Sequence, residues 1–153
     1  MGGTGFIRNA IRDELTGTDP EAFETSDIDV LYFDPNNRSS AVKERHERAL
    51  AGAFPGAVWQ VRNQVRMHLR NNDPPYRDTA HAMRHWLETP TAIAARLRGG
   101  RAELLAPLGI EDLLTLRLRP TAAGARKPDQ FKKRLRERNW QRRWPVMRLE
   151  QPR

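Results

Sequence analysis

The chain has 153 residues, of which 38% are apolar and none is cysteine. This length suits one domain of about 100–200 residues, and the lack of cysteine excludes disulfide frameworks, thiolate metal sites and thiol nucleophiles. The sequence contains no run of about 18 apolar residues that would indicate a membrane span. Its start, MGGTGFIRN, lacks the charged stretch and apolar core of a secretory signal. We therefore expect a cytoplasmic protein with no membrane role, folded as one domain over residues 1–153.

Positive charge is concentrated near the C-terminal end. Residues 117–153 contain 13 Lys and Arg against 3 Asp and Glu, whereas the preceding 116 residues are close to neutral. Such a basic tail suits a polyanion, either nucleic acid or nucleotide phosphates. A solvated helix face that aids solubility explains the same pattern, so charge alone leaves both interpretations open.

The first half of the chain alternates helix and strand patterns. Apolar side chains recur at helical spacing over residues 6–15. The segment 27–33, DIDVLYF, predicts a strand because it is rich in β-branched and aromatic residues and ends at the turn DPNN. A second helix begins at a cap on Ser39 or Ser40 and ends at the next Pro-Gly pair. VWQVRNQVRMHL, over 58–69, predicts a second strand.

The second half predicts shorter elements. We expect a helix over 79–87 capped by Asp78, a hairpin that turns at the Gly-Gly pair 99–100, a short helix over 111–118 and a basic helix over 129–143. This order indicates the α+β class, with helices packed against one mixed sheet and a basic helix at the C-terminus.

The sharpest chemical feature is the pair Asp27 and Asp29 in the first predicted strand. Because side chains alternate along a strand, both carboxylates project to one face, about 7 Å apart along the backbone. Two like charges repel unless a cation lies between them, and hard oxygen ligands suit Mg²⁺ or Mn²⁺. A metal held in this way serves nucleotidyl transfer by neutralising phosphate oxygens. A solvated strand end is the alternative that the motif alone leaves open.

Glycines precede the first predicted helix. Gly2, Gly3 and Gly5 let backbone N–H groups approach a phosphate, to which the helix dipole adds attraction. Arg8 and Asn9 follow within the first turn of that helix. A loose N-terminus would explain the glycines alone, but the Asp pair that follows favours a nucleotide site made by Gly3, Gly5, Arg8 and Asn9.

The stretches GGTGFIRNAIRDELTG and SDIDVLYFD resemble the glycine/arginine helix and Asp-x-Asp strand of DNA polymerase beta-like nucleotidyltransferases, including the CCA-adding enzymes. With NQVRMH, DPPYR, AMRHW, LLAPLGIEDLL and RNWQRRWP, the chain resembles a bacterial family of uncharacterised nucleotidyltransferase-like proteins over nearly all of residues 3–149. The resemblance implies a minimal nucleotidyltransferase fold, Mg²⁺ and an NTP donor. It leaves the acceptor open, with RNA and a small molecule as the candidates.

Two features depart from the pattern of this family. Relatives carry a further helix and strand ahead of the glycine motif, so we expect these to be missing and one sheet edge, beside DIDVLYF, to be left unpaired. Enzymes of the superfamily also use a third carboxylate on a neighbouring strand, and the strand predicted over 58–69 offers none. Glu103 and Asp112 remain the candidates for that carboxylate.

In the strand predicted over 58–69, the even positions from Gln60 to His68 are all polar, and the odd positions are apolar except Asn63. This alternation predicts one packed face and one face open to solvent or to a cleft. Gln64, Arg66 and His68 offer an amide, a guanidinium for phosphate and a titratable base. We therefore predict that these three side chains line the substrate cleft.

Weaker patterns favour structural roles. His81 and His85 lie four residues apart, a metal-compatible spacing, but no third ligand is evident nearby, which favours a surface or core pair. Asp34 is expected to cap the turn after the first strand. Trp140 and Trp144 are expected to anchor the last helix on the core, with stacking on bases as the alternative.

Three functions compete. The first is an enzyme that transfers a nucleoside monophosphate from an NTP to an unknown acceptor, with Asp27 and Asp29 holding Mg²⁺. The second is a catalytically inactive nucleotide- or RNA-binding protein, favoured by the missing third carboxylate and the basic tail. The third is a structural or antitoxin-like partner that keeps only the fold. Metal-dependent release of pyrophosphate separates the first from the other two.

Overall fold

Five strands form one mixed sheet in the computed structural model, which describes residues 2–3, 5–22 and 27–150. Their spatial order is β3-β2-β1-β4-β5. The β2–β3 pair is parallel and the other three pairs are antiparallel. The α+β class with a mixed sheet is therefore confirmed. The strands are β1 (Gly2–Gly3), β2 (Ile28–Tyr32), β3 (Trp59–Asn63), β4 (Ala94–Arg98) and β5 (Arg101–Leu105).

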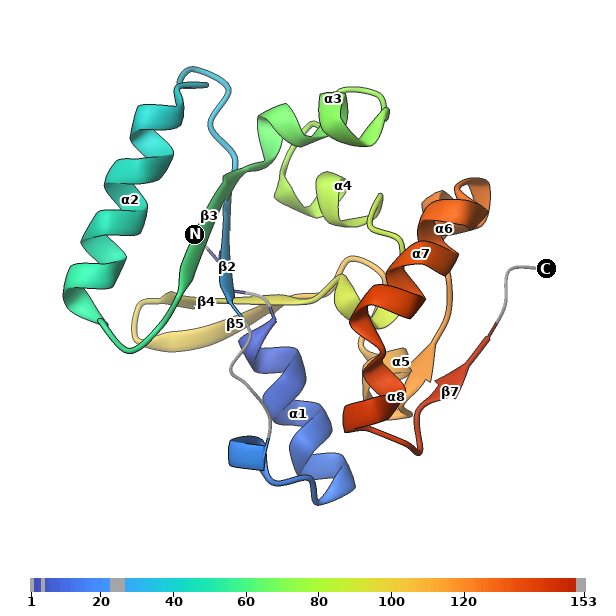
Figure 1. Cartoon of the computed structure of the whole chain (residues 1–153). Helices are drawn as coiled ribbons and strands as arrows, with labels where there is room; N and C mark the ends of the chain where they lie inside the picture. The colour runs from blue at the N-terminus through green and yellow to red at the C-terminus, as the bar shows by residue number, and fades with distance from the viewer. Residues whose placement is uncertain (1, 4, 23–26, 151–153) are drawn as a thin grey trace.

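Eight α-helices and a small parallel ribbon surround this sheet in the described part of the chain. In Figure 1, α2 runs beside β3, whereas α7 and α8 stand on the other side of β2, and α8 lies near α1. The helices are α1 (Phe6–Thr16), α2 (Ser40–Ala53), α3 (Met67–Asn71), α4 (Thr79–Met83), α5 (Glu111–Leu114), α6 (Ala122–Arg126), α7 (Pro128–Arg138) and α8 (Trp140–Arg143), and the ribbon pairs β6 (Arg117–Leu118) with β7 (Arg148–Leu149).

The short strand β1 joins the two halves of the sheet. Gly3 pairs with Val30 of β2 on one side and with Ala95 of β4 on the other. Since β3 pairs with β2 along its whole length, β2 lies inside the sheet. The expectation of an unpaired edge beside DIDVLYF is therefore wrong, because the glycines themselves form the neighbouring strand.

The strand predicted over 58–69 ends at Asn63. The side chain of Asn63 accepts hydrogen bonds from the backbone N–H groups of Val65 (3.2 Å) and Asp34 (3.1 Å), and it donates to the carbonyls of Asp34 (2.9 Å) and Asn37 (3.0 Å). These bonds hold a 3₁₀ turn that leads directly into α3. The polar alternation beyond Asn63 therefore does not describe the faces of a strand.

Several predicted helices are shorter than the pattern suggested. The helix predicted over 79–87 ends at Met83, and the one predicted over 111–118 ends at Leu114 because β6 begins at Arg117. The basic helix predicted over 129–143 breaks at Asn139, whose φ of 40° lies in the left-handed region and separates α7 from α8. Helix α6 forms over residues for which no helix was predicted.

Two apolar clusters support the fold. One joins the sheet to α4. Trp86 and Leu105 pack against its buried members, which are Leu31, Met83, Ala92 and Ala94. The other joins β6 to the end of the chain and contains Leu118, Trp144 and Met147, with Leu135 and Trp140 packed against it.

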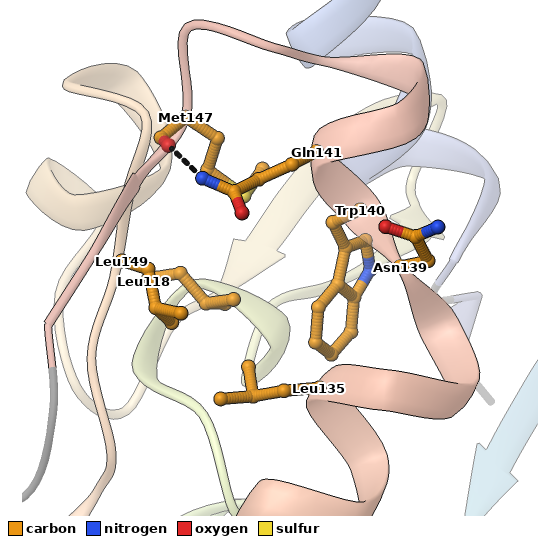
Figure 2. Close-up of a pocket in the computed structure, with 7 residues that line it drawn as sticks. All are labelled: Leu118, Leu135, Asn139, Trp140, Gln141, Met147 and Leu149. Atoms are coloured by element: carbon orange, nitrogen blue, oxygen red, sulfur yellow. Dashed lines mark hydrogen bonds between the residues drawn. The ribbon is translucent and has the colours of Figure 1, made fainter.

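Figure 2 shows that Trp140 and Leu135 face Leu118 across a small hollow. The side-chain amide of Gln141 closes one end of it by donating to the carbonyl of Met147 at 3.1 Å. Trp140 and Trp144 therefore anchor the last helices to the core, as predicted. No helix in the described ranges is both long and apolar enough to cross a membrane.

Candidate functional site

Gly5 brings the first turn of α1 against the start of β2, which contains Asp29 and directly follows Asp27. Its φ of 57° lies in the left-handed region, which glycine adopts without strain. A Cβ at this position would lie 3.4 Å from the carbonyl oxygen of Asp27. The chain therefore passes from β1 into α1 directly beside Asp27, and Gly5, Arg8 and Asn9 all line the cleft described next.

Asp27 and Asp29 line one cleft of about 1170 Å³, which confirms that their side chains share a face. Two residues of β3 contact them. The amide of Gln60 donates to Asp27, and Nε of Arg62 lies 3.3 Å from a carboxylate oxygen of Asp29. The neighbouring strand thus presents an amide and a guanidinium to the carboxylate pair.

Both candidates for a third carboxylate are wrong. Glu103 pairs with Arg96 across the β4–β5 hairpin at 2.7 Å, and Asp112 accepts hydrogen bonds from Thr89 (2.5 Å) and Arg119 (2.8 Å). Neither residue lines the cleft. The pairing of Glu103 follows from the register of the hairpin, in which Arg96 lies opposite Glu103, whereas the pairing of Asp112 also depends on Thr89, 23 residues away.

The donor set at the cleft fits Mg²⁺ that keeps water and phosphate ligands. Within the described residues there is no group of three or more His, Cys, Asp or Glu side chains that could hold a metal alone. Mg²⁺ is, however, usually bound by one or two carboxylates together with waters and substrate phosphates. Asp27 and Asp29 satisfy that requirement, provided that Arg62 moves off Asp29.

Arg8 places a half-buried positive charge near the carboxylate pair. One of its terminal nitrogens donates to the carbonyl of Thr91, and its guanidinium carbon lies 5.7 Å from the centre of the Trp86 ring. Burial lowers the pKa of Arg8 to about 10, while the negative charge of Asp29 acts in the opposite direction. At pH 7 the guanidinium is still charged and lines the cleft.

Arg12 and Asp13, which sequence reasoning missed, form the buried face of α1. They are 1% and 4% exposed, whereas the apolar Phe6 and Leu15 are exposed. Asp13 accepts two hydrogen bonds from Arg143, at 2.6 and 3.0 Å, and a third from the indole N–H of Trp144 at 2.9 Å. Asp13 therefore ties α1 to α8, and no local pattern could have revealed partners 130 residues away.

Glu88 is the other buried acid that sequence reasoning missed. It is fully buried in the wall of the cleft, where it forms an ion pair with Nε of Arg134 at 2.7 Å and accepts a hydrogen bond from the Thr91 hydroxyl at 2.9 Å. This ion pair fastens α7 to the segment that precedes β4. The isolated Glu in HWLETPT carries no motif that would have predicted it.

The basic C-terminal segment forms the other wall of the cleft. Arg134 and Arg138 of α7 and Arg142 of α8 all line it. At one end, the ammonium of Lys127 is held by Asp73 and by the carbonyl of Asn71, both at 2.6 Å. Much of the C-terminal positive charge thus faces the carboxylate-bearing strand instead of serving only as a solvated surface.

Of the three residues predicted to line the substrate cleft, Gln64, Arg66 and His68, the structure places only Gln64 at this cleft. Because β3 ends before them, Arg66 turns away and donates to the carbonyl of Arg38 at 2.7 Å. The ring of His68 lies 2.9 Å from the carbonyl of Val65. On the strand itself, Gln60 and Arg62 occupy the cleft face.

The weaker predictions of structural roles agree with the structure. The rings of His81 and His85 meet edge to face with their centres 4.9 Å apart, and both contact the ring of Tyr76. Asp34 accepts a hydrogen bond from the N–H of Asn36 at 2.9 Å and so caps its turn.

Comparison with known proteins agrees with this geometry. A family model described as "Nucleotidyltransferase" matches residues 3–149. The chain belongs to this nucleotidyltransferase family. It is also similar to a solved structure described as "The NMR structure of the protein reveals a CCA-adding enzyme head domain", with 32% identity and a TM-score of 0.83 over 98% of this chain and 80% of that one. No curated protein matches the sequence.

The comparisons confirm both the resemblance noted from the sequence and the fold class. The mixed sheet and its helices match the fold of the CCA-adding enzyme head domain. The glycine-led α1 and the carboxylate-bearing β2 therefore belong to a nucleotidyltransferase fold, which extends through the C-terminal helices to Leu149.

Proposed function

We propose that this nucleotidyltransferase transfers a nucleoside monophosphate from an NTP to an acceptor, with Asp27 and Asp29 holding Mg²⁺ or Mn²⁺. The observation that carries the proposal is the placement of both carboxylates in one cleft, beside Arg8 and facing the basic helices α7 and α8. A carboxylate pair and a cationic wall are the two parts that phosphoryl transfer needs, because catalysis there consists largely of positioning and charge stabilisation.

The reaction exchanges one phosphorus–oxygen bond for another. An acceptor oxygen bonds to the α-phosphorus, the bond from that phosphorus to the α–β bridging oxygen breaks, pyrophosphate leaves and the acceptor proton passes to solvent. A divalent cation bound by the carboxylates supplies charge neutralisation at the phosphate oxygens. The charge that develops on the pyrophosphate also faces Arg8, whose half-buried guanidinium interacts more strongly than it would in water.

In this proposal, Gln60 and Arg62 contact the carboxylates of Asp27 and Asp29 until the metal–nucleotide complex binds. The Arg62 side chain is 36% exposed and contacts Asp29 at 3.3 Å, a distance typical of a weak ion pair. Its departure therefore costs little when a metal–nucleotide complex arrives. Once released, the guanidinium stays in the cleft and can bind a phosphate oxygen.

A catalytically inactive nucleotide- or RNA-binding protein is the second candidate. The observation in its favour is that β3 presents Gln60 and Arg62, and no carboxylate, to Asp27 and Asp29. The further acids on the described cleft surface are Glu88, which is paired with Arg134, and Glu137, which lies near Lys133. The cationic wall would bind nucleotide or RNA phosphates even without turnover.

Transfer of label separates the two candidates. The protein is incubated with each of the four NTPs, labelled on the α-phosphate, and with the RNA and small-molecule fractions of a cell extract. We expect metal-dependent transfer of label to one fraction, with pyrophosphate release, and at least a 100-fold loss in Asp29→Asn. Glu103→Gln, which alters an exposed acid outside the cleft, is the matched control. Nucleotide binding without transfer or pyrophosphate release in every fraction would favour the inactive protein.

A further inference from the structure

Arg12 is a buried cation for which the described residues supply no ion pair. It is 1% exposed, and its terminal nitrogen Nη2 is buried without a hydrogen-bond acceptor in the described part of the protein. Burial lowers the pKa of Arg12 to about 9, so the side chain is still charged at pH 7. The side chain nevertheless lies among the residues that line the cleft, so a small shift of the neighbouring side chains would open it to a ligand there.

The acids closest to Arg12 are already engaged. Asp13 accepts three hydrogen bonds from Arg143 and Trp144, and Glu88 is paired with Arg134. The guanidinium contacts the Trp144 ring, whose centre lies 5.0 Å from its central carbon. A cation–π contact compensates a buried charge less well than a carboxylate does.

Arg8 adds a second positive charge on the same wall. It lies four residues before Arg12 on α1, so the two side chains project from one face of the helix. Nε of Arg8 is also buried without an acceptor among the described atoms, and the positive charges of Arg134 and Arg138 act on it. Two neighbouring, desolvated guanidinium groups are stabilised most effectively by an anion that contacts both.

We propose that Arg12, together with Arg8, forms an anion subsite that takes a phosphoryl group without a metal, one helical turn along α1 from the part of the cleft near Asp29. The subsite rests on the proposed function in that its ligand belongs to the nucleotide reaction. The phosphoryl group comes either from the terminal phosphates of the NTP donor or from a phosphate of the acceptor, and both present the same charged oxygens.

The uncompensated charge predicts an unusual pair of effects for Arg12→Met. Methionine removes a buried charge while keeping an unbranched apolar chain against Trp144, so the variant should melt at a higher temperature than the wild type in the absence of ligand. The same change should weaken binding of pyrophosphate at least tenfold. A purely structural Arg12 would give the opposite effect on melting.

Thermal unfolding in EDTA with pyrophosphate as the probe tests the proposal without turnover. We expect pyrophosphate to raise the melting temperature of the wild type and of the control Arg48→Met, an exposed arginine on α2, and to have little effect on Arg12→Met. Arg12→Lys, which keeps the charge without the planar fork, should retain part of the response. An Arg12→Met protein that melts below the wild type, or responds to pyrophosphate as the wild type does, overturns the proposal.

Two further ligands identify the source of the phosphoryl group. An Arg12-dependent response to ATP but not to AMP assigns the subsite to the donor's terminal phosphates. An Arg12-dependent response to a 5′-phosphorylated dinucleotide, absent with the unphosphorylated one, assigns it to the acceptor. If neither response depends on Arg12, the subsite does not exist. The melting experiment needs no transfer of a nucleotide. It can therefore support the subsite when no transfer activity is found, and it can reject the subsite when transfer activity is found.

Discussion

Removing the charge of Asp13 should separate the two walls of the cleft. The Arg143 and Asp13 side chains are 15% and 5% exposed and are joined at 2.6 Å, with a second hydrogen bond at 3.0 Å. Breaking a buried ion pair by removing one partner costs about 3–5 kcal/mol, since the other charge stays buried. Asp13→Asn keeps an oxygen that can accept from Trp144, so we expect a loss of about 3 kcal/mol in the free energy of unfolding.

Chemical denaturation and heating measure this loss directly. For a protein of this size, about 1 kcal/mol corresponds to roughly 2–4 °C in melting temperature, so Asp13→Asn should melt about 6–12 °C lower than the wild type. Glu137→Gln is the control, because Glu137 and Lys133 are 61% and 68% exposed and 3.7 Å apart. Exposed pairs contribute about 0–1 kcal/mol, so the control should stay within about 0.5 kcal/mol of the wild type.

A double-mutant cycle then shows whether the loss belongs to the pair. Once Arg143→Met has removed the partner, Asp13→Asn should cost much less than it does alone, with a coupling free energy of about 2 kcal/mol or more. Nucleotide affinity should fall in Asp13→Asn because α8 loses its attachment to α1. A loss below about 1 kcal/mol, or independent effects of the two substitutions, would refute the argument that Asp13 joins these helices.

Two glycines provide further predictions. Gly124→Ala should lower the free energy of unfolding by about 1–3 kcal/mol, as measured by denaturant titration, because its Cβ would meet the carbonyl oxygen of Leu87 at 2.1 Å; Gly52→Ala, which meets no atom within 4 Å, should not lower it. Gly5→Ala should cost about 1–2 kcal/mol because of its left-handed φ of 57°. It should therefore lower the melting temperature as well as nucleotide affinity, and an unchanged melting temperature would show that the φ of Gly5 is not required.

Features determined by short-range chemistry were predictable from the sequence. The alternation of a strand places Asp27 and Asp29 on one face, and the structure has both in one cleft. The cap at Asp78 and the turn at Gly99 and Gly100 depend on neighbouring residues and were also predicted. The resemblance over residues 3–149 predicted the nucleotidyltransferase fold of the whole domain, and the family match confirms the resemblance.

Features that depend on distant partners were not predictable. Asn63 ends β3 by bonding to the loop around Asp34, so the alternation that continued past it was misleading. Asp13 and Glu88 are buried because Arg143 and Arg134, contributed by the C-terminal helices, reach them. No pattern within α1 shows that Arg12 and Asp13 are buried, since the same two residues in the same positions could equally face solvent.

The central claim is that Asp27 and Asp29 together hold one metal–nucleotide complex. Electron paramagnetic resonance of Mn²⁺, titrated with a non-hydrolysable NTP analogue, tests it most directly, because it reads the metal whatever the acceptor is. We expect the wild type and Glu103→Gln to bind Mn²⁺ only in the presence of the nucleotide, and both Asp27→Asn and Asp29→Asn to weaken that binding at least tenfold while melting no lower than the wild type. Wild-type Mn²⁺–nucleotide affinity in either aspartate variant would contradict the account.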